Sequence, residues 1–231
     1  GVGGKPEVRT LLFPAGQTEI VETWDVLGLR GTGSDAYEVK DLFIPAAHSV
    51  VRATMFENRP PHGTSSLFAF PQMSVHAIGF AATATGTARG FLDAFLEMAQ
   101  TKTPRLHTSP LRESPVVQDD VGRAEARLSA GRAWLMQEAE AAWQEVEDHG
   151  VLSIAQRNRI RLSATHAIHE AKGAVDSLYD SAGTSAVFAQ GPFERRFRDV
   201  HMIAQQIQGR KSHYRSVGAW LLGGEPDMGV I

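Results

Sequence analysis

The spacing of apolar residues changes once along this chain, close to residue 60. Before that point, β-branched and aromatic residues form three short runs, at about 8–13, 19–24 and 36–44, separated by turn-forming residues. After it, apolar residues recur every three or four positions over long segments, which is the period of an amphipathic α-helix. The pattern predicts an α+β chain, with a partial antiparallel β-domain at residues 1–58 and an antiparallel helical bundle of the four-helix type at 59–231.

Three long apolar stripes predict the main helices of the bundle. The stripes extend from about Phe70 to Gln100, from Val117 to Val146, and from Ile160 to Leu178. Helix stops are expected at Thr103-Pro104, His149-Gly150 and Ala182-Gly183. Ser153 is placed to cap the start of the third helix. A fourth helix is expected from about Pro192 to Gln208, with a last segment that continues through Leu222.

Composition narrows the functional classes. The chain has 231 residues, a formal charge of −3 and no cysteine, so neither nucleic acid nor a membrane surface is an expected partner, and thiolate chemistry is excluded. No apolar run approaches the roughly 20 residues that a bilayer span needs. These features predict a cytoplasmic location. The chain starts at Gly1, and its first two strand-like runs have no partner strands before them, which predicts a fragment of a longer protein.

One segment, Gly183–Asp199, combines small residues with a cluster of charge. Its turn leaves backbone N–H groups available to an anion, and the following helix start favours negative charge. The cluster consists of three arginines and two acids: Glu194, Arg195, Arg196, Arg198 and Asp199. Because the guanidinium donors exceed what two acids can pair, the segment suits an anionic cofactor or a subunit contact. The alternative is a glycine helix stop followed by a solvated helix start.

A second segment, from Trp24 to Ser34, contains three glycines together with hydroxyl residues. Arg30, the hydroxyl groups and the open N–H groups suit a phosphate or a polar ring, and Trp24 can cover an aromatic face. The alternative is an ordinary turn between two strands.

Other catalytic patterns are weak in this sequence. His166 and His169, with Glu170, share a helix but lack the HExxH spacing of a zinc site, so no metal is predicted. His201 and His213 are each candidates for a general base. The sequence contains no serine-hydrolase elbow, no Walker A motif and no dinucleotide-binding glycine motif.

The two segments together resemble the acyl-CoA dehydrogenase superfamily. The runs WDVLGLRGTGS (Trp24–Ser34) and VKDLFIP (Val39–Pro45) resemble the end of its β-domain. GPFERRFRDV (Gly191–Val200) resembles the last-but-one helix of its C-terminal bundle, and GAWLLGGEP (Gly218–Pro226) resembles its tail. The amino-acid sequence of the first run is more similar to the flavin-dependent monooxygenase branch, which includes two-component aromatic hydroxylases and dibenzothiophene monooxygenase-like enzymes. Residues 1–58 then correspond to the later part of the middle β-domain.

The resemblance implies a flavin site between the β-domain and the bundle, often completed by a neighbouring subunit of a tetramer. The implied cofactor is FMN or FAD, whose reduced form is the co-substrate. The matching positions in this chain are Trp24, Arg30, Thr32 and Ser34 in the loop, and Gln118, Gly183, Thr184 and Ser185 in the bundle.

The implied catalytic position lies a few residues after the Arg-Asp pair. Some dehydrogenases of the family carry a glutamate base here, and the monooxygenases often carry a histidine. This chain has Gln205 or Gln206 at the matching place, with His201 one helical turn earlier. An amide cannot accept the α-proton that dehydrogenation removes, so the departure argues against that chemistry. His201 or a residue outside this chain is the expected proton carrier.

The function implied by this resemblance is a flavin-dependent monooxygenase. A partner reductase supplies reduced flavin, and a flavin hydroperoxide oxygenates an aromatic or other small organic substrate. Two alternatives remain open. One is an acyl-CoA dehydrogenase-like oxidoreductase with a displaced base, and the other is a non-catalytic truncated paralogue that acts in oligomer assembly.

Overall fold

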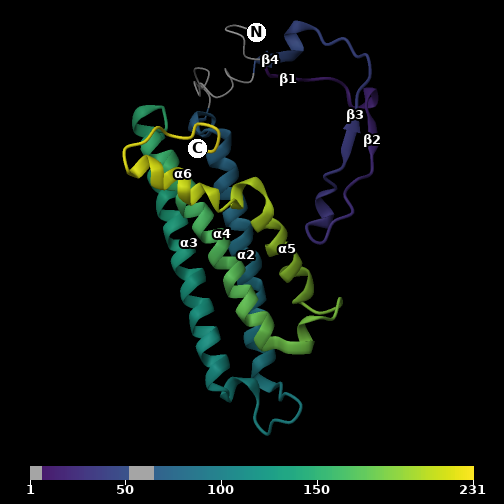
Figure 1. Cartoon of the computed structure of the whole chain (residues 1–231), viewed down its shortest axis with the longest axis vertical. Helices are drawn as coiled ribbons and strands as arrows, with labels where there is room; N and C mark the ends of the chain where they lie inside the picture. Colours follow the sequence, from purple (N-terminus) through teal and green to yellow (C-terminus); the bar gives the residue numbers. More distant parts are fainter. Residues whose placement is uncertain (1–6, 52–64) are drawn as a thin grey trace.

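The structure is a computed structural model that describes residues 7–51 and 65–231. The domain boundary expected at residues 58 and 59 lies outside these described residues. A strand-containing segment runs alongside a much longer helical bundle (Figure 1). The α+β class, with antiparallel strands followed by antiparallel helices, is confirmed.

The N-terminal segment forms two small antiparallel pairs. The strands are β1 (Arg9–Leu11), β2 (Glu19–Val21), β3 (Ala36–Glu38) and β4 (Ser49–Val51). β1 pairs with β4, with Arg9 opposite Val51, and β2 pairs with β3, with Glu19 opposite Glu38. All three expected strands are shorter than the sequence runs, and β4 was missed. The third run continues past the end of β3, and within it Asp41 adopts a positive φ of 49°, which is incompatible with an extended strand.

Five α-helices form most of the described residues 65–231. They are α2 (Gln72–Thr101), α3 (Pro115–His149), α4 (Ile154–Ala182), α5 (Glu194–Gln205) and α6 (Ser212–Leu221). Short 3-10 turns connect many of these elements: η2 (Ala15–Gln17), η3 (Arg30–Thr32), η4 (Ala46–His48), η5 (Ser66–Ala69), η6 (Leu111–Glu113), η7 (Gly183–Ala186) and η8 (Ile207–Gly209). The three long helices α2, α3 and α4 alternate in direction, α5 packs beside α2 and α4, and α6 crosses one end (Figure 1).

The expected helix ends are mostly confirmed. Gly150 and Gly183 end α3 and α4 with positive φ angles of 70° and 58°. The Ser153 hydroxyl accepts a hydrogen bond from the backbone N–H of Gln156, as an N-cap should. The fourth helix is shorter than expected: it stops at Gln205, and η8 follows. Gly209 lies so close to the chain that a Cβ there would come within 2.8 Å of the Ala204 carbonyl oxygen.

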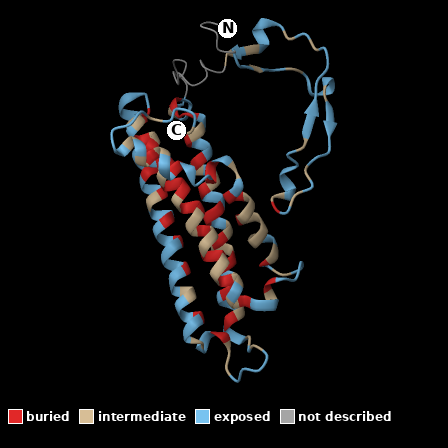
Figure 2. Cartoon of the chain, in the orientation of Figure 1, coloured by how far each residue is buried: buried red, intermediate tan, exposed pale blue. Residues whose placement is uncertain are grey.

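Buried side chains concentrate on the facing sides of α2, α3, α4 and α5 (Figure 2). Aromatic contacts attach α5 to this core, since Phe193 packs on Phe91 with ring centroids 5.0 Å apart and Phe197 stacks on Tyr179 at 4.1 Å. Among the described residues, no helix is both long enough and apolar enough to cross a membrane.

Candidate functional site

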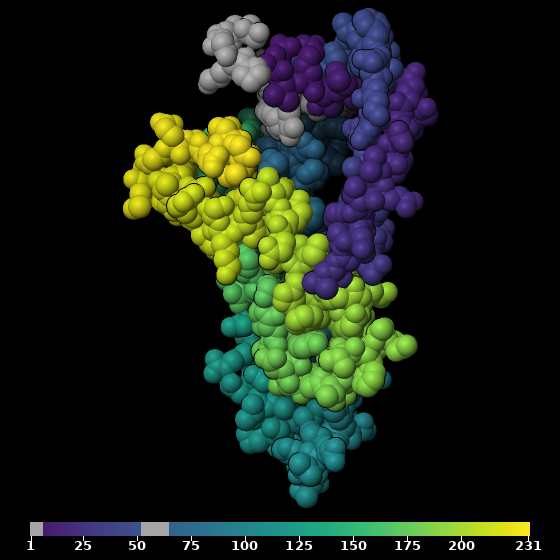
Figure 3. Space-filling model, turned by 45° about the vertical axis from the view of Figure 1, so that its right-hand side comes forward, coloured from purple at the N-terminus to yellow at the C-terminus, as the bar shows by residue number. Residues whose placement is uncertain are grey.

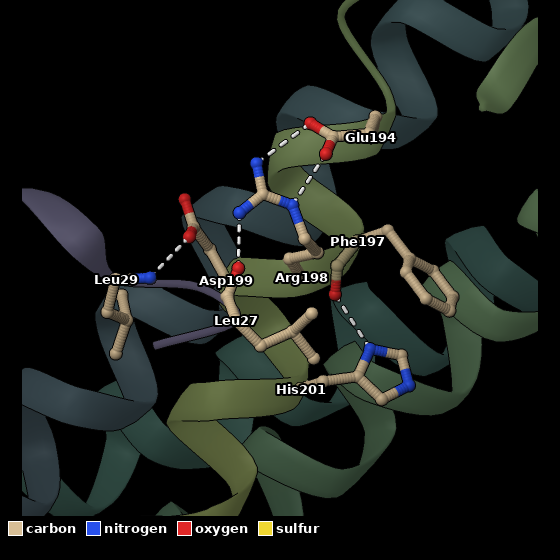
Figure 4. A network of polar contacts seen from close by, with 7 residues as sticks. All are labelled: Leu27, Leu29, Glu194, Phe197, Arg198, Asp199 and His201. Atoms are coloured by element: carbon tan, nitrogen blue, oxygen red, sulfur yellow. Dashed lines mark hydrogen bonds and ion pairs between the residues drawn. The ribbon is translucent and has the colours of Figure 1, made fainter. Parts of the chain in front are cut away.

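The loop between β2 and β3 docks on α5. The backbone N–H of Leu29 donates to Asp199 Oδ1 at 2.7 Å, and the Arg198 guanidinium donates to the Leu27 carbonyl oxygen (Figure 4). Gly28 lies between these contacts, and a Cβ at this position would come within 2.6 Å of the Arg198 carbonyl oxygen. Only glycine therefore allows the two backbones to approach so closely. The space-filling view shows the N-terminal segment in purple against the yellow-green α5 (Figure 3).

Hydrogen bonds within the loop fix its shape. Leu29 adopts a left-handed conformation with φ 55°, and its carbonyl oxygen accepts from Trp24 Nε1 and from Thr32 Oγ1, each at 3.0 Å. Thr32 and Ser34 hydroxyls lie 3.0 Å apart. Because the Thr32 proton goes to a carbonyl, Ser34 must be the donor in that pair. Both hydroxyl protons are thus used within the loop, which leaves the arginines as the side-chain donors for a ligand.

A cavity of about 460 Å³ lies at the junction of this loop and α5. Its lining residues are Leu29, Arg30, Gly31, Thr32, Arg195, Arg198 and Asp199. The loop supplies two residues that the sequence predicted, Arg30 and Thr32. The helix supplies the Arg-rich cluster, whose members were recognised as a possible anion site but not assigned to the flavin. The cavity therefore joins the two segments that the sequence singled out.

The two acids beside this cavity are already paired. Glu194 accepts two hydrogen bonds from Arg198, at 2.6 and 3.0 Å, and these bonds hold the pKa of the Glu194 carboxyl below its usual value. Asp199 accepts from the loop backbone. Within the part of the chain that the structure describes, the side chains of Arg30 and Arg195 have no hydrogen bond or ion pair. Two guanidinium groups therefore line the cavity without a carboxylate in hydrogen-bond or ion-pair contact, although Arg195 acts electrostatically on Glu194, and this arrangement suits a phosphate or another anion.

The other predicted cofactor residues lie elsewhere, where α4 ends near the start of α3. Lys102, which the sequence did not single out, donates from Nζ to the Ala182 carbonyl oxygen and to Ser185 Oγ, each at 2.6 Å. Burial lowers the pKa of Lys102. Gln118 donates to the Arg112 carbonyl oxygen at 2.9 Å. Neither Gln118 nor the turn of Gly183, Thr184 and Ser185 lines the loop–α5 cavity.

Comparison with known proteins identifies the family. The sequence profile of the family described as acyl-CoA dehydrogenase, C-terminal domain, matches residues 78–209. This chain belongs to that family.

Relatives of this acyl-CoA dehydrogenase family member include named monooxygenases. The chain is 29% identical over 223 residues to indole-3-acetate monooxygenase from Pseudomonas putida, an alignment that covers 96% of this chain and 56% of the relative. It is 27% identical over 236 residues to the oxygenase component of FADH2-dependent resorcinol hydroxylase from Rhizobium sp., which covers 96% of this chain and 58% of that protein. The chain thus spans about half the length of these curated relatives.

A solved structure shows the same fold. XiaF from Streptomyces sp., solved in complex with FADH2 and glycerol, matches with a TM-score of 0.88 at 21% identity. The match covers 95% of this chain and 57% of the XiaF chain. It therefore supports the acyl-CoA dehydrogenase-like architecture of the described residues.

The predicted catalytic residues of this family member lie along α5 and the turn after it. His201 Nδ1 lies 2.7 Å from the Phe197 carbonyl oxygen, and its Nε2 lies 3.0 Å from Asp176 Oδ1 (Figure 4 shows the first contact). Both ring nitrogens face acceptors, so neither presents a free lone pair to a substrate in this arrangement. Gln205 is exposed at the end of α5, and Gln206 Oε1 accepts from a backbone N–H. The roles given to these three residues stay predictions.

The helical histidines considered for a metal have separate partners. The His166 ring packs against Trp134 with centroids 5.4 Å apart, and His169 Nε2 lies 2.8 Å from the Gly209 carbonyl oxygen. Glu170 Oε2 lies 3.4 Å from Arg127 Nε in an ion pair. In residues 7–51 and 65–231, no group of three or more His, Cys, Asp or Glu is placed to hold a metal ion.

Proposed function

We propose that this chain is part of the oxygenase component of a two-component flavin-dependent monooxygenase. The observation that carries the proposal is the loop–α5 cavity, where Arg30 and Arg195 come together without carboxylate partners. This cavity lies between the β-segment and the bundle, where the family resemblance expects a flavin. The named functions of the Pseudomonas and Rhizobium relatives support the same chemistry.

The residues at this junction fit the phosphate-bearing part of a flavin nucleotide. A cavity of about 460 Å³ falls within the roughly 300–1,000 Å³ that is usual for small-molecule sites. Its two unpaired guanidinium groups match a phosphate in charge and hydrogen-bond geometry. We propose reduced FMN or FAD as the co-substrate. The relative from Rhizobium is an FADH2-dependent hydroxylase and XiaF was solved with FADH2, which supports FAD. When bound, reduced flavin supplies the electrons that activate oxygen.

The residues of this chain bind the cofactor and orient the substrate. Arg30 and Arg195 would hold the anionic part of the cofactor. Trp24 does not line this cavity; its ring nitrogen donates to the Leu29 carbonyl oxygen and so helps to fix the shape of the loop. Gln206 positions a substrate oxygen by hydrogen bonding but cannot carry a proton. His201 ties α5 to α4 through Asp176, and it moves a proton only if one of its two contacts opens.

Partners and assembly follow from the same proposal. The relative from Rhizobium is named an oxygenase component, which supports a separate flavin reductase as the source of reduced flavin. The substrate is expected to be an aromatic or other small organic molecule. Because Gln118 and the Gly183–Ser185 turn lie apart from the loop–α5 cavity, we infer that they contact flavin bound by another copy of the chain, as in a homotetramer. A cytoplasmic location stays a prediction.

A second candidate is an acyl-CoA dehydrogenase-like oxidoreductase, which the description of the family favours. That reaction needs a base for an acidified α-proton. The stretch from Val200 to Gln208 contains no carboxylate, and the Gln206 side chain is an amide tied to the backbone. Oxidation of an acyl-CoA by the protein, with no oxygenated product, would favour this candidate over the monooxygenase.

The deciding experiment titrates the purified chain with FMN and FAD, oxidised and reduced, and follows absorbance and fluorescence. Arg30→Ala and Arg195→Ala should each weaken binding by roughly tenfold or more, because each removes a charge-assisted hydrogen bond. Arg159→Ala is the matched control, since Arg159 is exposed on α4 and its side chain has no hydrogen bond or ion pair among the described residues. If all three variants bind flavin equally well, the loop–α5 cavity is not the flavin site.

A further inference from the structure

The short turn η8, which joins α5 to α6, is held from both sides by histidines. His213 on α6 is buried, and its Nε2 lies 2.7 Å from the Ile207 carbonyl oxygen. His169 on α4 makes the equivalent contact with the Gly209 carbonyl oxygen at 2.8 Å. A carbonyl oxygen only accepts, so both Nε2 atoms must donate. The backbone of the turn is therefore fixed at its first and last residue.

The middle residue of the turn is held by a buried arginine. Arg161 on α4 is 1% exposed and donates to Gln208 Oε1 at 2.6 Å, to the Val230 carbonyl oxygen at 2.6 Å and to the Met73 carbonyl oxygen at 3.2 Å. Burial lowers its pKa to about 10. No described carboxylate lies within ion-pair distance of this guanidinium. Burying a charge against neutral acceptors alone costs free energy. The contribution of Arg161 is therefore the fixed geometry that its three hydrogen bonds impose on the turn.

These contacts determine which way the Gln206 side chain faces. The Gln208 side-chain atom that accepts from Arg161 must be its oxygen, and the Gln206 atom that accepts from the Gln208 backbone N–H at 2.6 Å must be oxygen too. The Gln206 amide nitrogen is then left as the free end of the side chain. Nε2 has no hydrogen bond within the described chain and is not among its buried unpaired atoms. Gln206 thus offers N–H donors to its surroundings.

The charges around the turn favour an acceptor that is negative. The charged side chains that act on His169 and His213 are four cations and two acids: Arg161, Lys172, Arg210, Lys211, Glu170 and Asp227. Among the groups that act on these two histidines, cations therefore outnumber acids by four to two. An N–H donor in a positive environment binds an anionic oxygen better than a neutral one.

We propose that Arg161 is a positioning residue, which holds the Gln206 amide through Gln208 so that its N–H group receives an anionic oxygen of the substrate. The oxygen belongs to a carboxylate or a phenolate. The substrate half of this proposal rests on the proposed monooxygenase function, whereas the positioning half concerns the ligand-free chain.

Two substitutions at the centre of the relay test the positioning. Gln208→Glu keeps an acceptor for Arg161, whereas Gln208→Met removes it at similar size. Hydrogen exchange at the backbone N–H of residue 208, measured in the ligand-free full chain, should be faster in Gln208→Met by roughly tenfold and nearly unchanged in Gln208→Glu. Arg161→Lys, which keeps the charge but not the three-way geometry, should fall between them. Equal exchange in the two Gln208 variants would overturn the positioning role.

Binding of three probes tests the recognition. The probes are indole-3-acetate, which carries a carboxylate, resorcinol, which carries phenol groups, and indole, which carries neither; each is titrated into the full chain with FAD. Gln206→Glu keeps the acceptor for the Gln208 N–H but replaces the outward donor by negative charge. Gln206→Glu should weaken the binding of one of the two oxygen-bearing probes by roughly tenfold or more and leave the binding of indole unchanged. Gln17→Glu, which adds the same charge at an exposed position of the β-segment, should change neither.

The outcomes separate the two proposals. A loss confined to indole-3-acetate identifies a carboxylate, and a loss confined to resorcinol at high pH identifies a phenolate. Equal weakening of indole, or no weakening of any probe, overturns the recognition by Gln206. If the unsubstituted chain binds neither flavin nor an anionic probe, the monooxygenase function and the recognition both fail, while hydrogen exchange at residue 208 still decides the role of Arg161.

Discussion

The β-segment and the helical bundle are stabilised in different ways. In the described residues 7–51, Gly28 is the single buried residue, whereas every long helix of the bundle contributes a row of buried side chains (Figure 2). The bundle can therefore form by burying apolar surface, which dominates folding. The β-segment has little core of its own, and its placement depends on the polar contacts of Leu27 and Leu29 with α5.

The candidate cofactor site lies where these two regions meet. One wall of the cavity, with Arg195, belongs to a helix that is anchored in the core through Phe193 and Phe197. The other wall, with Arg30, belongs to a loop that is held by two polar contacts and by the partly buried Leu29 side chain, which packs against the core. A change in the loop should therefore alter ligand binding before it alters stability, and a change in the core should do the reverse.

The largest expected effect comes from the same substitution made in each region. Phe91→Ala should lower the free energy of unfolding by about 3–5 kcal/mol, because Phe91 is 0% exposed in the bundle core. Phe43→Ala should change it by less than about 0.5 kcal/mol, because Phe43 is 84% exposed in the β-segment. Denaturant unfolding followed by circular dichroism measures both. A similar loss in the two variants would show that the β-segment has a core of its own.

A smaller effect is expected at the contact between the regions. Gly28→Ala places a Cβ within 2.6 Å of the Arg198 carbonyl oxygen, so the loop must move away from α5. The affinity for flavin should fall by roughly tenfold or more, while the free energy of unfolding of the helices should change by about 1 kcal/mol or less. Flavin titration and thermal unfolding of the same samples measure the two effects.

The control for that prediction is Gly16→Ala, where a Cβ meets open space. It should change neither flavin binding nor helix unfolding. If Gly28→Ala binds flavin like the unsubstituted chain, the docked loop is not part of the cofactor site.

The same contrast explains how well the sequence predicted each region. The long helices α2, α3 and α4 were predicted nearly to their ends because long apolar stripes, Ser153 and Gly150 are local features with fixed consequences. The strands were predicted too long, and β4 was missed. Three-residue strands leave almost no periodic pattern, and their pairing depends on distant residues, as with Arg9 opposite Val51.

The candidate site likewise contains residues that local sequence features predicted and contacts that only the folded structure shows. Arg30 and Thr32 were found because glycine and hydroxyl residues mark a loop that approaches a ligand closely. Their meeting with Arg195 across about 165 positions of sequence is a tertiary contact that no local spacing predicts. Lys102 and Arg161 were missed because a single basic residue in a helical or loop segment has no distinctive pattern. Only their neutral hydrogen-bond partners in the folded structure, Ser185 for Lys102 and Gln208 for Arg161, reveal them.

Exposed apolar side chains on the β-segment predict self-association of this chain. Leu12, Tyr37 and Phe43 are each more than 60% exposed, and short strands leave unpaired edges beside them. Light scattering should therefore show a mass above that of one chain, through this surface or through the helices. Phe43→Lys should lower the associated fraction if the β-segment is the contact. A monomer at all concentrations would contradict the prediction.

The smallest expected effect is a dependence of bundle stability on pH. Burial lowers the pKa of His169 and of His213, against an ordinary histidine value of about 6.5. Between that value and the lower folded pKa, the unfolded chain binds protons that the folded chain does not. The stability contributed by the neutral rings is thus complete above about pH 6.5 and is lost as the pH falls below it.

Thermal unfolding measured from pH 7.5 to pH 5 should therefore show a falling midpoint below about pH 6.5. The Glu125 carboxyl, whose pKa is lowered to about 2 by hydrogen bonds from Arg89 and Ser129, titrates well below this window and does not produce the change. His213→Gln should reduce the fall, because an amide nitrogen donates to the Ile207 carbonyl oxygen without titrating. His76→Gln, at an exposed position on α2, should leave it as it is. An unchanged pH profile in His213→Gln would mean that the η8 turn, although held by the buried His213 ring, is not coupled to the folding of the bundle as a whole.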